Sequence, residues 1–116
     1  MANNFHHSRR AVYRVVYPVR ERPSFLMDGA SFSVIDCSEL GLRYQVPDVH
    51  RPEVGTTVSG HVRFRRGSEV PVTGEVIRVE NGTVALWFRT QAISLTEMMT
   101  ERRYLESADH SMDEER

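Results

Sequence analysis

A group of arginines near the N-terminus, Arg9, Arg10 and Arg14, has the chemistry to bind a small phosphorylated ligand. A guanidinium group bridges two phosphate oxygens with paired charge-assisted hydrogen bonds, and it can also pair with the O6 and N7 edge of guanine. In an extended segment Arg10 and Arg14 would point to the same side, about 13 Å apart, whereas a helix would place them one turn apart. An extended segment here therefore predicts a site for an elongated anionic ligand.

A second group, Asp36, Ser38 and Gly41, forms an Asp-x-Ser-x-x-Gly pattern. In a strand Asp36 and Ser38 would share one face, and Cys37 would point to the other, where a buried position facing the core is expected. A carboxylate can accept hydrogen bonds from the adjacent N1–H and N2–H₂ donors of guanine, and Ser38 can add another hydrogen bond. Gly41 would permit a positive φ or a close approach of the backbone to the ligand.

Both groups adjoin segments with the composition of β-strands. Residues 11–19 are rich in valine and tyrosine until Pro18 interrupts them, which predicts a strand that ends in a turn. Residues 31–37 form a second predicted strand, and residues 42–46 then alternate between apolar and polar side chains. The polar turn between these two segments predicts a hairpin.

Two further hairpins are expected downstream. Residues 58–64 alternate and reach Val70 and Val72 through a turn at 66–68. The run 74–79 and the run 84–88 flank Asn81-Gly82, and this dipeptide between apolar runs is a strong hairpin signal. Six or seven short antiparallel strands at this spacing favour a small barrel or sandwich in the mainly β class. Trp87 and Phe88 lie in the last run, and at least one of them is expected in the core.

The C-terminal part of the chain predicts one amphipathic helix that packs on the sheet. Ser94 and Glu97 make a capping box, and apolar residues follow at helical spacing: Leu95, Met98, Met99 and Leu105. We expect a flexible lead-in at residues 1–8, one domain at 9–107 and an acidic, disordered tail at 108–116.

Composition restricts the class of protein. The 116 residues, of which 40% are hydrophobic, suffice for one modest core. No apolar run is long enough to cross a bilayer or to act as a secretory signal, so a soluble cytoplasmic protein without membrane insertion is expected. The net charge of −1 combines a basic beginning with an acidic end. Cys37 is the only cysteine and the histidines are scattered, so neither a disulfide nor a metal site is predicted.

Taken together, Arg10 to Arg14 and Asp36 to Gly41 resemble the signature of the PilZ domain family, an RxxxR motif followed about 20 to 30 residues later by a D/NxSxxG motif. The resemblance covers about residues 9 to 107. It implies a small six- or seven-stranded antiparallel β-barrel with a C-terminal helix and a flexible N-terminal arm. It also implies that Arg10 and Arg14 bind the second messenger cyclic di-GMP, and that Asp36, Ser38 and Gly41 complete the site.

The resemblance has further implications. An extra arginine just before the motif, here Arg9, accompanies binding of two intercalated ligand molecules in this family, although a single ligand also remains open. Arg78 lies where family members place a residue that stacks on a guanine, and a guanidinium plane can do so. The implied function is a non-enzymatic receptor without a cofactor, whose arm folds over the ligand and signals to a protein effector in motility, adhesion or biofilm control.

Other interpretations compete with this one. The arginines could be solvated strand-edge charges, and Asp, Ser and Gly are also the residues that turns select. A PilZ-like interaction module without a ligand, in a motility or pilus assembly, is the main alternative function. A small oligonucleotide-binding barrel is disfavoured by the net charge of −1 and the acidic C-terminal segment, so no nucleic-acid partner is expected. An enzyme comes last, because no set of nucleophile, base and metal can be assembled from these residues.

Overall fold

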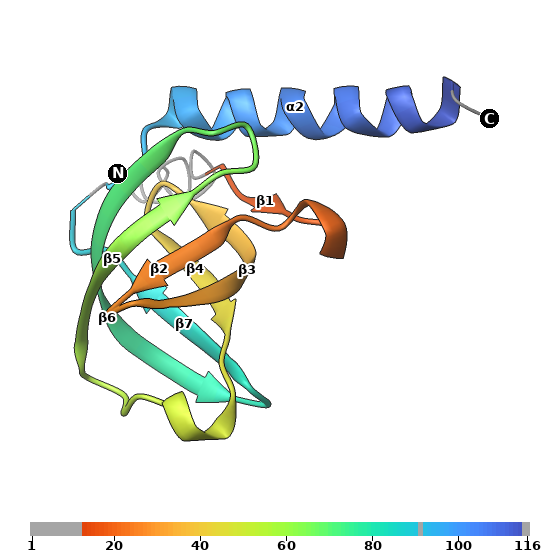
Figure 1. The fold of residues 1–116 in the computed structure, drawn as a ribbon. Helices are drawn as coiled ribbons and strands as arrows, with labels where there is room; N and C mark the ends of the chain where they lie inside the picture. Colours follow the sequence, from red (N-terminus) through yellow and green to blue (C-terminus); the bar gives the residue numbers. More distant parts are fainter. Residues whose placement is uncertain (1–12, 91, 115–116) are drawn as a thin grey trace, which may run out of the picture.

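The computed structural model describes residues 13–90 and 92–114. Seven antiparallel strands run in the order β1-β3-β2-β5-β6-β7-β4, and pairing of β3 with β4 closes six of them into a barrel (Figure 1). The short β1 lies outside this barrel beside β3. The strands are β1 (Val15–Val16), β2 (Ser24–Met27), β3 (Ala30–Ser38), β4 (Gly41–Gln45), β5 (Thr57–Arg63), β6 (Glu69–Glu80) and β7 (Thr83–Trp87). The predicted mainly β fold, a small antiparallel barrel with a C-terminal helix, is confirmed.

Tight turns join neighbouring strands. Asn81 and Gly82, with φ of 54° and 74°, connect β6 to β7, as their Asn-Gly sequence predicts. Asp28 and Gly29, with φ of 51° and 79°, make a second hairpin of this kind between β2 and β3. The strand β2 was not predicted from the sequence, because its apolar part is only the three residues 25–27, which do not alternate with polar ones.

Two strand predictions need correction. The first strand spans only Val15–Val16 of the expected residues 11–19, of which 11 and 12 lie outside the described residues, and Pro18 then leads into the short 3-10 helix η1 (Val19–Glu21). Val70 and Val72 and the run 74–79, which were expected in two separate hairpins, belong to the single 12-residue strand β6. The first part of β6 pairs with β5 and the last part with β7, and Glu75 pairs with both.

Buried hydrophobic side chains fill the barrel. Tyr44 packs against Phe25 and Phe32, with ring centroids 4.9 and 5.5 Å apart. Cys37 is fully buried, as predicted, and burial raises the pKa of its thiol well above the ordinary range. At the end of β7 at least one of Trp87 and Phe88 was expected in the core, and Phe88 lies there while Trp87 is exposed.

The helix α2 (Leu95–Glu114) lies across one end of the barrel, and its C-terminal part extends beyond the strands (Figure 1). The backbone N–H of Glu97 donates to Ser94 Oγ at 3.0 Å, which confirms the predicted N-terminal cap. The helix continues past residue 107, which was the expected end of the domain. No helix in the described ranges is long and apolar enough to span a membrane.

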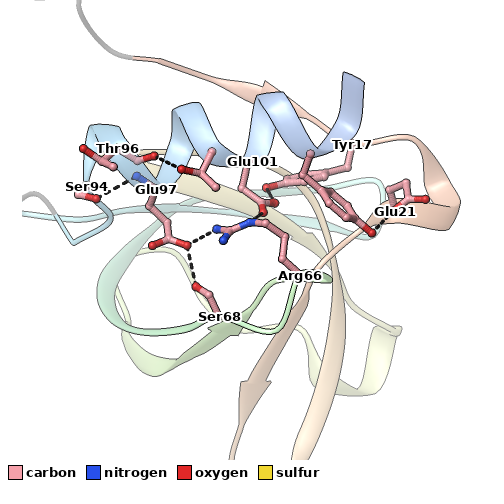
Figure 2. Close-up of polar contacts among 10 residues, drawn as sticks. Tyr17, Glu21, Arg66, Ser68, Ser94, Thr96, Glu97 and Glu101 are labelled. Atoms are coloured by element: carbon pink, nitrogen blue, oxygen red, sulfur yellow. Dashed lines mark hydrogen bonds and ion pairs between the residues drawn. The ribbon is translucent and has the colours of Figure 1, made fainter. Parts of the chain in front are cut away.

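Polar side chains fasten α2 to the barrel (Figure 2). Glu97 accepts hydrogen bonds from Arg66 and, at 2.6 Å, from Ser68 Oγ, both in the loop between β5 and β6. Burial alone would raise the pKa of Glu97, but the hydrogen bonds from Ser68 and Arg66 and the charge of Arg66 outweigh it and lower that pKa. Glu97 is therefore held as a carboxylate.

The next turn of α2 supplies a second acid, Glu101, which is buried (Figure 2). Its carboxylate accepts from Arg66 and, at 2.6 Å, from the hydroxyl of Tyr17, which directly follows β1. Burial raises the pKa of Tyr17 far above the ordinary range, and the hydrogen bond to Glu101 raises it further. The protonated phenol thus links the N-terminal segment to the helix.

Candidate functional site

An open cavity of about 400 Å³ on the outer barrel surface brings predicted site residues together. Arg14, Ser38, Gly41 and Arg78 all line it, although they are up to 64 positions apart in the sequence (78 minus 14). The remaining lining residues are Leu40, Leu42, Arg43, Ile77, Ala85, Leu86 and Trp87. The volume is in the range of small-molecule sites. Arg9 and Arg10, the other predicted arginines, lie outside the described residues.

Asp36 lies beneath this cavity rather than on its surface. Its side chain is only 1% exposed, and its Oδ1 accepts from Arg14 Nη1 at 2.9 Å. Its Oδ2 accepts from Arg43 Nε at 2.7 Å and lies 2.6 Å from Arg43 Nη2. A register shift between Val34 and Asp36 marks a β-bulge here, and the three residues 36–38 are all buried. Asp36 and Ser38 are therefore not the open surface groups that a simple alternation suggests.

Arg43 is a site residue that the sequence analysis missed. It pairs with Asp36 in the register of β3 and β4, and the hydrogen bond and charge of Asp36 raise the pKa of its guanidinium. One signal was available in the sequence. Leu42 and Tyr44 point into the core, so Arg43 between them must point outward on the strand that follows the Asp-x-Ser-x-x-Gly pattern.

Ser38 and Gly41 shape the turn between β3 and β4. Ser38 Oγ accepts from the backbone N–H of Leu40 at 3.2 Å and donates to the carbonyl of Gly41 at 3.3 Å. A Cβ on Gly41 would lie only 2.4 Å from the carbonyl oxygen of Leu86. Gly41 does not have a positive φ. Its missing side chain instead allows the close approach of β4 to β7, a structural reason that holds without any ligand.

Glu39 holds the backbone of Tyr13 close to this turn. Its buried carboxylate accepts from the backbone N–H of Tyr13 at 2.6 Å, immediately before Arg14. The guanidinium of Arg102, on α2, lies 5.3 Å from the centroid of the Tyr13 ring. These contacts, which the sequence did not reveal, direct Arg14 toward Asp36.

Arg78 reaches the cavity from β6 through a second bulge. Val76 pairs with Leu86 and Arg78 with Ala85, so Ile77 is an extra residue, and both Ile77 and Arg78 are exposed. Arg78 thus joins Arg14 and Arg43, so that three guanidinium groups line the cavity, while no Asp or Glu of the described residues does. The resulting positive charge favours an anionic ligand. Within residues 13–90 and 92–114, no cluster of His, Cys, Asp or Glu could hold a metal ion.

Several solved structures share this fold. The inhibitor of motility MotI/DgrA of Bacillus subtilis matches with a TM-score of 0.62 at 12% identity, over 89% of this chain and 52% of its own. YcgR of Escherichia coli in complex with c-di-GMP matches with a TM-score of 0.53 at 21% identity, over 92% of this chain and 49% of its own. The separate PilZ domain of YcgR with c-di-GMP has a TM-score of 0.53 at 18% identity, over 92% and 96% of the two chains.

The chain thus spans about half the length of the first two proteins and nearly all of the isolated YcgR domain. No curated protein sequence matches significantly. The PilZ domain family, whose members are typically non-catalytic binding modules, matches residues 7–107, which include both motifs and the whole barrel. The chain belongs to the PilZ domain family.

Proposed function

We propose that this protein is a receptor for cyclic di-GMP and that the cavity described above is its binding site. The observation that carries the proposal is the convergence of Arg14, Ser38, Gly41 and Arg78 on one cavity, with Asp36 directly beneath. Family membership supports it, as does the similarity to two structures that contain c-di-GMP. Arg9 and Arg10 immediately precede the segment that carries Arg14 and complete the proposed site.

The ion pairs of Asp36 suggest how the ligand enters. Arg14 makes one contact with this carboxylate, whereas Arg43 makes two with the other oxygen. A phosphate can therefore draw Arg14 away while Arg43 continues to neutralise Asp36. The freed Oδ1 of Asp36 then becomes an acceptor for the N1–H and N2–H₂ donors of guanine. The exchange leaves no buried charge unpaired, which keeps its cost low.

The same segment offers a route for the signal. Arg14 precedes β1, and Tyr17 follows β1 and donates to Glu101 of α2. In the proposed mechanism the N-terminal arm, which carries Arg9 and Arg10, becomes ordered over the ligand, and Arg14 moves away from Asp36. This movement displaces β1 and thereby changes the contact between Tyr17 and α2. A protein effector would respond to this change in surface. The entropic cost of ordering the arm is met by charge-assisted contacts to the ligand.

Isothermal titration calorimetry with cyclic di-GMP tests the proposal, and separate titrations with GTP and cyclic di-AMP measure its specificity. Arg10→Ala, Arg14→Ala and Asp36→Asn should each weaken binding at least about tenfold, the loss of one charge-assisted contact. Arg51→Ala is the matched control, because Arg51 is as exposed as Arg14, 53% against 55%, and pairs with Asp48 instead. The molar ratio distinguishes one bound ligand from an intercalated pair.

One observation favours an alternative, a ligand-independent interaction module. Asp36 and Ser38 are already satisfied by partners within the protein, so the barrel does not need a ligand to be complete. Absence of heat of binding and of any thermal stabilisation by cyclic di-GMP in the folded wild type would make this alternative the better account. Selective binding that is lost in the arginine variants would exclude it.

A further inference from the structure

Three large apolar side chains are exposed at the cavity: Leu40, Ile77 and Trp87. They stand beside the guanidinium groups that serve a phosphate, yet phosphate recognition gives no reason for an apolar wall. A site for a purine nucleotide does need one, because the base presents a flat aromatic surface that must be removed from water. Trp87 is the largest of the three, and the residue remains 41% exposed.

The backbone fixes Trp87 in this position. Leu86 and Phe88 are buried, so the alternation of β7 points Trp87 outward. Its partner on β4 is Gly41, which has no side chain to cover the indole. On the other side, the bulge in β6 adds Ile77 to the exposed surface next to Arg78. The two strands that flank β7 thus leave the indole accessible from the cavity.

The indole is also held in place. The guanidinium of Arg89 lies over its ring, 5.8 Å from the centroid, and forms an ion pair of 2.9 Å with Glu75. Arg89 does not line the cavity, whereas Trp87 does. Such a cation–π contact restrains the ring without occupying the cavity, which reduces the entropy that a ligand must remove.

We infer that Trp87 is a base-stacking residue of the ligand site, with Ile77 as its apolar neighbour, and that it selects for a purine ring rather than for a phosphate alone. This inference rests on the proposed function, because it assigns a base of the same ligand to the apolar wall. It predicts that the base lies over the indole while Arg14 and the arm bind the phosphates. It adds Trp87 to the residues that both sequence motifs indicate.

The chain contains one tryptophan, so its fluorescence reports on this residue alone. Stacking of guanine should quench the emission of the wild type during titration with cyclic di-GMP, after an inner-filter correction measured on free tryptophan. Inorganic pyrophosphate, which has no base, should leave the emission unchanged. Titration calorimetry on the same samples measures binding independently of the tryptophan.

Variants separate stacking from general packing. Trp87→Leu should weaken cyclic di-GMP about 5- to 100-fold, the usual effect of losing an aromatic stacking partner, whereas Trp87→Phe should retain most of the affinity. Met99→Ala on α2 removes a side chain of the same 41% exposure away from the cavity and should have no effect. Melting curves establish that each variant folds.

Two outcomes would overturn the inference in different ways. If the wild type binds cyclic di-GMP by calorimetry without quenching, and Trp87→Leu binds equally well, the receptor proposal stands and the stacking role fails. The exposed indole would then suit a protein partner instead. If the folded wild type shows no binding in the calorimeter, the receptor proposal fails and the stacking role fails with it.

Discussion

At Asp36 two arginines make unequal contributions. The carboxylate is almost completely buried, and removing one partner of a buried ion pair is costly because the other charge is left uncompensated. Arg43 contacts it through Nε and Nη2, whereas Arg14 contacts it through Nη1 alone. Arg43 is therefore expected to stabilise the fold by pairing with Asp36, whereas Arg14 can leave Asp36 for a ligand phosphate.

We predict that Arg43→Ala lowers the free energy of unfolding by about 2 kcal/mol, a value reduced from that of a fully buried pair because Arg43 is half exposed. Arg14→Ala should cost less than about 1 kcal/mol, since both contacts of Arg43 remain. Urea unfolding measures both. The double variant Arg43→Ala/Asp36→Asn should recover part of the loss, because it removes the unpaired charge. Equal losses for the two single variants would contradict this division of roles.

At the scale of elements, the approach of β4 to β7 depends on a single glycine. A Cβ at Gly41 would lie 2.4 Å from the carbonyl oxygen of Leu86, and a strand backbone cannot yield as a flexible side chain can. Gly41→Ala should therefore destabilise the barrel by about 1–3 kcal/mol, as overpacking does. The exposed Gln45 on the same strand provides the control, since Gln45→Ala should change stability by less than about 0.5 kcal/mol. Urea unfolding should separate the two variants. Unchanged stability with lost ligand binding would instead assign Gly41 to close approach of the ligand.

The attachment of α2 to the barrel should depend on pH. The pKa of Glu97 is lowered in the folded protein, so its ionised form contributes stability that is fully present above the ordinary carboxyl pKa of about 4.3. This stability is lost as the pH falls through the lowered value. The difference in unfolding free energy between wild type and Glu97→Gln should thus be constant near neutral pH and shrink below about pH 4.3. Glu80→Gln, at an exposed position, should give a small difference throughout. A Glu97→Gln effect that grows on acidification would have the wrong sign for this ion pair.

At the scale of the whole molecule, those features of the fold that a few neighbouring residues determine could be predicted from the sequence. The hairpin at Asn81-Gly82 and the helix start at Ser94 follow from residues that favour one backbone conformation. The strand β2 was missed because its short apolar run carries no period, although Asp28-Gly29 next to it is a hairpin signal. Arg43 was missed because its role depends on a bulge and on cross-strand register.

The attachment of α2 could not be predicted for another reason. Arg66 lies 31 and 35 positions from Glu97 and Glu101, and a single sequence contains no trace of such a pairing. The two motifs of the proposed site could be read from the sequence because each is short and local. The spacing of Arg14, Asp36, Ser38 and Gly41 was visible, whereas the cavity that unites them with Arg78 exists only after the barrel closes.

Stability and ligand binding should be separable in the whole molecule. The closed barrel runs from β2 to β7, and the helix α2 follows it, so a chain that starts at Tyr13 retains every described strand, the contact between Tyr17 and Glu101 and the cavity. Deletion of residues 1–12 removes Arg9 and Arg10 and should shift the melting temperature by only a few degrees, because 1 kcal/mol corresponds to about 4–8 °C in a domain of this size. Its affinity for cyclic di-GMP should nevertheless fall more than about tenfold.

The full chain should be stabilised by about 2.7 kcal/mol at a ligand concentration 100 times Kd, and the truncated chain should gain far less at the same concentration. A full-length Arg9→Ala/Arg10→Ala variant distinguishes the two charges from the length of the arm. If it melts and binds like the truncated chain, the arginines account for the arm's contribution. If the truncated chain binds as tightly as the full chain, the arm is not part of the site, and the cavity between Arg14 and Arg78 must hold the ligand unaided.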